Sequence, residues 1–139
     1  MQTIEEIVLI GVDETALQAK MVLPPNPKSY AVLIHAPGGG RHDRPVKTAA
    51  KAFEGKNIGL LIPDLTDETE GWHGIKDEAF LIERAQAVIA WFLARAQANA
   101  VVVYAVEPTE GFVAALGGLP EVAEVRTVLA QEAEQIRVD

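Results

Sequence analysis

The stretch HAPGGGRH, residues 35–42, holds the residue types in this sequence that are best suited to chemistry. A histidine can act as a general base, or it can orient a neighbouring loop by hydrogen bonding. Gly38, Gly39 and Gly40 can adopt conformations that point backbone N–H groups at an anion, although a tight turn has the same composition. The stretch therefore predicts an anion-binding loop or a turn, with His35 as its base or its support.

Charged residues continue directly from this loop. Arg41 and Arg44 can each clamp a carboxylate with two hydrogen bonds, and a solvated surface with a helix cap is the alternative. We expect Arg41 and His42 to contact a ligand together with the three glycines. Neither the phosphate loop pattern nor the dinucleotide-binding glycine pattern is present, so the sequence predicts no cofactor.

A second polar stretch, TDETEGWHG at residues 66–74, has no hydrophobic period and is predicted to be a surface loop. Trp72 and His73 flank a ligand in one interpretation and pack on the sheet in the other. The acidic residues of this region could hold a hard divalent cation or form a solvated surface: Asp64, Asp67, Glu68 and Glu70. Their spacing does not match an EF-hand, so we predict no metal site.

Composition narrows the classes of function. The 139 residues include no cysteine, which excludes disulfides and thiolate nucleophiles. The net charge is −8 without a Lys/Arg cluster, which argues against nucleic acid as a partner and favours small molecules or proteins. No apolar run reaches the roughly 20 residues of a membrane span, and no secretory signal is visible, so we expect a cytoplasmic protein of one domain over residues 1–139.

The elements that position these residues follow from hydrophobic patterning. Branched residues at 4–12 and 16–23 around a polar turn predict a β-hairpin. Short apolar runs predict buried strands at 30–35, 58–62 and 100–105, and helical spacing predicts helices at 45–55 and 77–96. The pattern indicates a three-layer α/β/α fold with a mostly parallel sheet, in which ligands lie at the carboxyl ends of strands. His35, Asp64 and Glu107 fall at such ends.

The C-terminal stretch has two interpretations. Apolar residues recur at helical spacing over residues 120–136, whereas VRTVLA taken alone is typical of a strand. The longer period favours a helix.

The stretch AVLIHAPGGGRH, followed by NIGLLIPDLTDE and FLIERAQAVIAWF, resembles the dienelactone-hydrolase-like branch of the α/β hydrolases over residues 4–116. The resemblance implies a shortened α/β-hydrolase-like fold and hydrolysis of small carboxylic esters or lactones. It also assigns the backbone of Ala36, Pro37 and Gly38 to the oxyanion loop, although proline has no N–H to donate.

The resemblance also places Thr109 where the family has its nucleophile, because E-P-T-E-G at 107–111 replaces G-x-S-x-G. A β-branched threonine fits the positive φ of that turn poorly, so we expect the turn not to be built there. The only serine is Ser29, and no Asp or His follows Thr109 except Asp139, so the family's triad is not expected.

Two functions remain after these departures. In the first, the chain is a hydrolase in which water is the nucleophile, with His35 and Glu107 among the candidate bases. In the second, it is a catalytically silent binding or assembly module on the same scaffold. A sheet of five or six strands leaves an apolar edge uncovered, so we expect a homo-oligomer.

Overall fold

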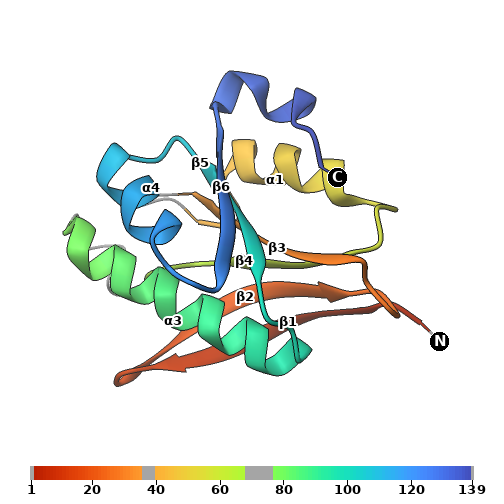
Figure 1. The fold of residues 1–139 in the computed structure, drawn as a ribbon, viewed down its shortest axis with the longest axis horizontal. Coiled ribbons are helices and arrows are strands. Elements are labelled where there is room, and N and C mark those ends of the chain that lie inside the picture. The colour runs from red at the N-terminus through yellow and green to blue at the C-terminus, as the bar shows by residue number, and fades with distance from the viewer. Residues whose placement is uncertain (1, 36–39, 68–76, 139) are drawn as a thin grey trace.

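The computed structural model describes residues 2–35, 40–67 and 77–138. Six strands form one sheet in the order β1-β2-β4-β3-β5-β6 (Figure 1). The strands are β1 (Ile4–Val12), β2 (Thr15–Leu23), β3 (Ser29–His35), β4 (Ile58–Pro63), β5 (Val101–Val106) and β6 (Val122–Val128). The helices are α1 (Arg44–Ala50), α3 (Glu78–Ala96) and α4 (Glu110–Gly117), with short 3₁₀ helices η1 (Lys51–Phe53) and η2 (Ala130–Gln135).

The predicted N-terminal hairpin is confirmed. Val12 pairs with Thr15 across a two-residue turn, and Asp13 takes the positive φ of 55° that such turns require. On β2, Leu17, Ala19 and Met21 alternate into the core, as expected of a strand with one buried face. β2 then pairs antiparallel with β4, so the hairpin forms one side of the sheet.

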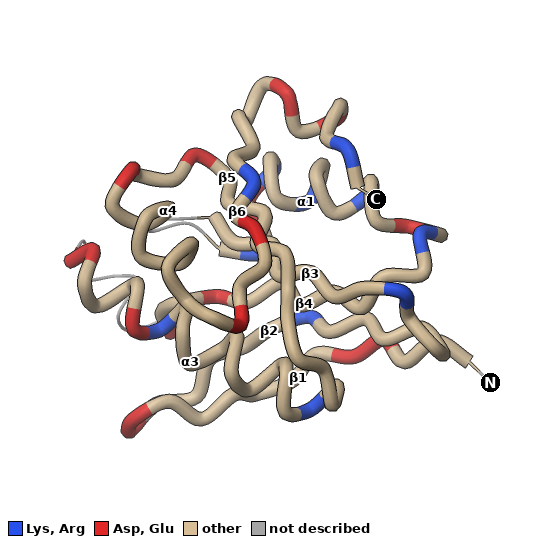
Figure 2. Tube along the Cα trace, viewed as in Figure 1, with Lys and Arg blue, Asp and Glu red and all other residues tan. Residues whose placement is uncertain are grey.

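The other four strands, β4, β3, β5 and β6, are parallel to one another. β3, β4 and β5 contain no Asp, Glu, Lys or Arg and are tan throughout in Figure 2. Helices cover both faces of these strands, which explains their continuous apolar sequences. His35 ends β3, Asp64 follows β4 and Glu107 follows β5, so the prediction that all three lie at carboxyl ends is confirmed.

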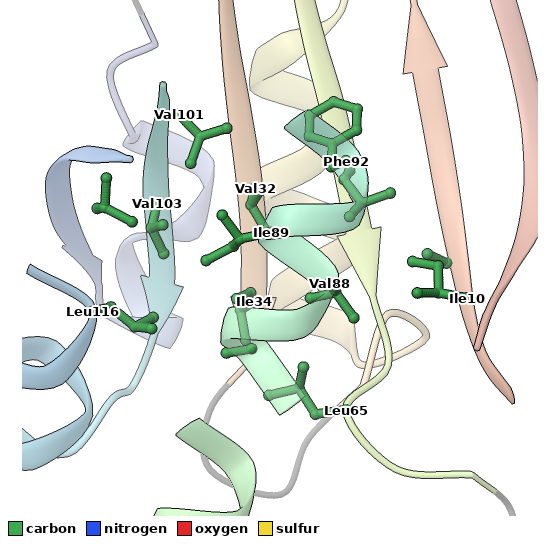
Figure 3. Close-up of a cluster of buried hydrophobic side chains, with 14 of the residues drawn as sticks. Ile10, Val32, Ile34, Leu65, Val88, Ile89, Phe92, Val101, Val103 and Leu116 are labelled. Atoms are coloured by element: carbon green, nitrogen blue, oxygen red, sulfur yellow. The ribbon is translucent and has the colours of Figure 1, made fainter. Parts of the chain in front are cut away.

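Two apolar clusters separate the three layers. One joins α3 and α4 to the sheet, and the other joins α1, η1 and η2 to its opposite face. Figure 3 shows Val88, Ile89 and Phe92 of α3 packed near Val32 and Ile34 of β3. The predicted α/β/α arrangement is therefore present.

The long helix α3 has clear signals at both ends. The Asp77 side chain accepts a hydrogen bond from the Ala79 N–H at 3.0 Å, which caps the N-terminus. Gln97 ends the helix in the left-handed conformation, with φ 56°. No helix in the described part of the chain is long and apolar enough to cross a membrane.

The prediction of a helix over residues 120–136 is wrong, because residues 122–128 form β6 and the short 3₁₀ helix η2 follows it. The pairing with β5 shifts from Val101↔Val122 to Val102↔Glu124, so Ala123 is an extra residue in a β-bulge. Val122 and Val125 therefore face the same cluster although they are three residues apart. This bulge gives a strand the apparent spacing of a helix.

Candidate active site

A histidine–aspartate pair lies at the carboxyl end of β3. The Nδ1 atom of His35 is 2.7 Å from Oδ2 of Asp43, and the same carboxylate oxygen accepts the Gly40 N–H at 2.9 Å. Because an ionised carboxylate only accepts hydrogen bonds, Nδ1 carries a proton, and in the neutral imidazole this leaves Nε2 as an acceptor. The His35 side chain is 23% exposed, so it is held without being sealed from solvent. Asp43 thus orients the imidazole.

Arg41 anchors the end of the same loop to two other strands. Its backbone N–H donates to Oδ1 of Asp64 at 2.8 Å, and its guanidinium pairs with the same carboxylate. A second guanidinium nitrogen donates to Oε1 of Gln18 on β2 at 2.8 Å. The Arg41 side chain is only 10% exposed and already makes these contacts, so the geometry supports an anchoring role, and the ligand contact of Arg41 stays a prediction.

The remaining residues predicted for the ligand site divide into two groups. His42 is exposed beside α1, and Gly40 packs so closely on Asp64 that a Cβ there would lie 2.8 Å from Oδ1. Gly38, Gly39, Trp72 and His73 lie outside the described residues, as do Ala36 and Pro37 of the predicted oxyanion loop. Their predicted roles stay predictions.

The sharp turn after β5 lies at Glu107, two residues before Thr109. Glu107 has φ 51°, and its N–H donates to the Val128 carbonyl at 2.9 Å. Its carboxylate accepts the Ala130 N–H at 2.9 Å, which directs the side chain towards the start of η2. The strained backbone position directly after this strand is therefore occupied by an acidic residue.

Thr109 has the extended backbone of a helix cap, with φ −78° and ψ 159°, so the expectation that it lacks positive φ is confirmed. Its hydroxyl oxygen accepts the Phe112 N–H at 3.1 Å, while its proton is donated to the carboxylate of Glu78. Thr109 is thus the N-cap of α4, a helix for which the hydrophobic pattern gave no prediction. The contact between Thr109 and Glu78 was not predicted, because the two residues are 31 positions apart in the sequence. The capping role of Thr109 had a local signal, since threonine is a preferred N-cap residue.

The register brings some of these groups to neighbouring strand ends. His35 pairs with Val106, so the His35 and Glu107 backbones are adjacent at one edge of the sheet. Among residues 2–35, 40–67 and 77–138, no hydrogen bond links the His35 side chain to Glu107 or Thr109. The structure therefore contains a His35–Asp43 pair and a separate Glu107 turn.

The acidic stretch after β4 is only partly described. Asp67 accepts a hydrogen bond from the Thr15 hydroxyl, and Asp64 is bound to Arg41. Glu68 and Glu70 lie outside the described residues, and within the remainder no group of three acidic or histidine side chains could hold a metal ion.

Comparison with solved structures places the fold. No protein-family model and no curated protein sequence matches this chain. A dienelactone hydrolase from Anabaena variabilis matches 91% of the chain with a TM-score of 0.79 and 20% identity. A dienelactone hydrolase-like promiscuous phosphotriesterase from metagenomic libraries matches 92% of it with a TM-score of 0.68 and 14% identity.

A lidless α/β serine hydrolase from Xanthomonas campestris matches 93% of the chain, with a TM-score of 0.60 and 12% identity. The chain spans 84% of that protein, but only 63% of the dienelactone hydrolase and 59% of the phosphotriesterase. At these identities the similarity concerns the arrangement of strands and helices.

Proposed function

Because the chain has a shortened α/β-hydrolase-like fold, we propose that it hydrolyses small carboxylic esters or lactones with water as the nucleophile. The observation that carries the proposal is the 2.7 Å contact between His35 and Asp43 at the carboxyl end of β3. In open α/β sheets this edge is where ligands bind. His35 is the general base in this proposal.

The proposed reaction conserves protons. Nε2 of His35 takes a proton from water while the water oxygen forms a bond to the carbonyl carbon of the ester. The negative charge of Asp43 stabilises the imidazolium that results. When the bond between the carbonyl carbon and the alcohol oxygen breaks, the imidazolium returns its proton to the leaving oxygen. The products are a carboxylic acid and an alcohol, which stay joined when the substrate is a lactone.

The polar contacts after β5 support water over a side-chain nucleophile. Thr109 caps α4 by accepting the Phe112 N–H, and its hydroxyl donates a hydrogen bond to Glu78. Both contacts hold the side chain at the start of the helix. Glu107 uses its carboxylate to accept the Ala130 N–H. Both side chains are therefore engaged in local structure.

The test is turnover of p-nitrophenyl acetate and dihydrocoumarin by the purified protein, with and without a chelator. His35→Gln should lower turnover by about 10²- to 10⁴-fold, the usual contribution of a general base. Asp43→Asn should give a smaller loss, because the amide cannot stabilise the imidazolium by charge. Asp13→Asn is the matched control, since asparagine tolerates the positive φ of the hairpin turn. A His35→Gln variant that is folded by circular dichroism and fully active would refute the proposal.

A second function, binding without turnover, is favoured by Glu107. An acidic residue with positive φ at the turn directly after β5 is compatible with a scaffold that keeps its ligand edge and lacks covalent chemistry. Absence of turnover, combined with amide shifts at residues 35 and 40–43 on titration with a lactone, would support this function instead.

A further inference from the structure

A groove of about 550 Å³ lies between the hairpin side of the sheet and α1, away from the Glu107 turn. Its floor comes from β1, β2 and β4, and its wall comes from α1 and η1. We propose that this groove binds an amphiphilic anion, a molecule with an unbranched apolar chain and a terminal carboxylate. The proposal concerns binding alone and does not depend on hydrolysis.

The floor of the groove is apolar. Ile58, Leu60 and Ile62 project from β4 on the α1 side, and Val22 of β2 and Phe53 of η1 adjoin them. Ile7 of β1 extends the floor and is 57% exposed, so an apolar surface continues from the core to solvent. The volume is within the range of about 300–1,000 Å³ that is typical of small-molecule sites. Ile58, Leu60, Ile62 and Phe53 are themselves buried, so the apolar surface that an alkyl chain would remove from water is chiefly that of Ile7 and the partly exposed Val22.

The rim of the groove has the opposite sign of charge to the whole protein. Lys47 and Lys51 are one helical turn apart, so both side chains reach the same side of the wall. In the described part of the chain neither lysine forms an ion pair. On the β2 side of the groove, Nζ of Lys20 lies 2.9 Å from Oε1 of Glu5, so this lysine is already paired.

Counting the whole lining gives the same sign. Four Lys or Arg residues line the groove against two Glu residues. Lys20 is paired with Glu5 and Arg41 with Asp64, which leaves Lys47 and Lys51 against Glu54 in a chain of net charge −8. In Figure 2 acidic and basic segments are mixed over most of the chain, and the charged residues of α1 and η1 are all basic. A carboxylate at Lys47 and Lys51, with its chain over Leu60, satisfies both the charge and the apolar floor.

The experiment is an NMR titration of the isotope-labelled protein with decanoate, decanol and decyltrimethylammonium. Decanoate should bind most tightly and should shift amides of β2, β4 and α1. The double variant Lys47→Gln/Lys51→Gln should weaken decanoate binding by about tenfold and leave decanol binding unchanged, because only the carboxylate uses the two charges. Ile7→Ser, at an exposed position, should weaken both ligands.

The matched control is Lys28→Gln/Lys56→Gln, which removes two exposed lysines outside the groove. Three results would overturn the proposal. The first is equal weakening of decanoate binding in this control, and the second is decanol binding as tightly as decanoate. The third is a protein that is a dimer by light scattering and whose groove amides do not shift in the NMR titration with decanoate. His35→Gln should bind decanoate normally, so the fate of the hydrolysis proposal does not decide this one.

Discussion

At the scale of single residues, two carboxylates organise the edge of the sheet. Asp43 accepts from the His35 ring and from the Gly40 N–H, and Asp64 accepts from the backbone and the guanidinium of Arg41. Each carboxylate therefore joins a strand end to the segment that precedes α1. Hydrogen bonds to a charged group are about twice as strong as neutral ones, so these contacts hold the segment in one position.

Gly40 offers a direct test of this anchoring. Gly40→Ala would place a methyl group 2.8 Å from Oδ1 of Asp64, so that carboxylate must move and its contacts with Arg41 weaken. We expect a loss of about 1–3 kcal/mol in the free energy of unfolding, measured by urea denaturation. Gly11→Ala is the control, because nothing lies within 4 Å of the added methyl group. Equal stability of the two variants would contradict the role of Asp64.

The positions of the site residues in the fold could be predicted from the sequence, but their contacts could not. His35, Asp64 and Glu107 could be placed at strand ends because apolar runs end just before or at them. Their partners could not be predicted, since Arg41 and Asp64 are 23 residues apart and meet only when β4 lies beside the loop. The left-handed conformation of Glu107 was also hidden, because glutamate gives no local signal for positive φ.

At the scale of elements, most of the fold follows from local patterning. The hairpin, the buried strands β3 to β5 and the long helix α3 have strong periods or clear boundaries, and all were predicted. β6 was predicted as a helix because its bulge shifts Val125 onto the face of Val122. α4 has only two fully buried apolar side chains, too few for a periodic signal. Pairing with β5, a tertiary contact, decides the outcome for β6.

The end of α3 carries a conformation that its residue type does not favour. Gln97 is left-handed, with φ 56°, and glycine adopts this conformation without a Cβ penalty. Gln97→Gly should therefore raise the free energy of unfolding by about 0.5–1 kcal/mol, measured by thermal and urea denaturation. Gln97→Ala keeps the Cβ and should leave stability nearly unchanged. A destabilised glycine variant would show that the Gln97 side chain makes a needed contact.

At the scale of the whole molecule, the sheet ends in two edge strands, β1 and β6. β1 is nine residues long and exposes Ile4, Ile7 and Leu9, the last of them by 65%. An exposed apolar edge strand is a template for pairing with another chain. We propose that two copies pair antiparallel through β1 about Val8. Ile7 would then lie opposite Leu9, and Glu5 opposite Gly11, so no like charges would meet.

Leu9→Lys tests this assembly by placing a charge at the centre of the proposed contact. The unmodified protein should elute as a dimer of the 15.0 kDa chain in size-exclusion chromatography with light scattering at micromolar concentration. The variant should be a monomer with an unchanged circular dichroism spectrum, because position 9 is exposed. Leu129→Lys, at an exposed apolar residue after β6, should remain dimeric. A monomeric unmodified protein would reject the proposal.

The turn after β5 also bears on how such a scaffold can diverge. Glu107 is exposed and belongs to neither apolar cluster, although it directly follows a strand whose other residues are almost all buried. Packing therefore places little constraint on which side chain stands there. The side chain at position 107 can thus change with little effect on the two apolar clusters that hold the fold together.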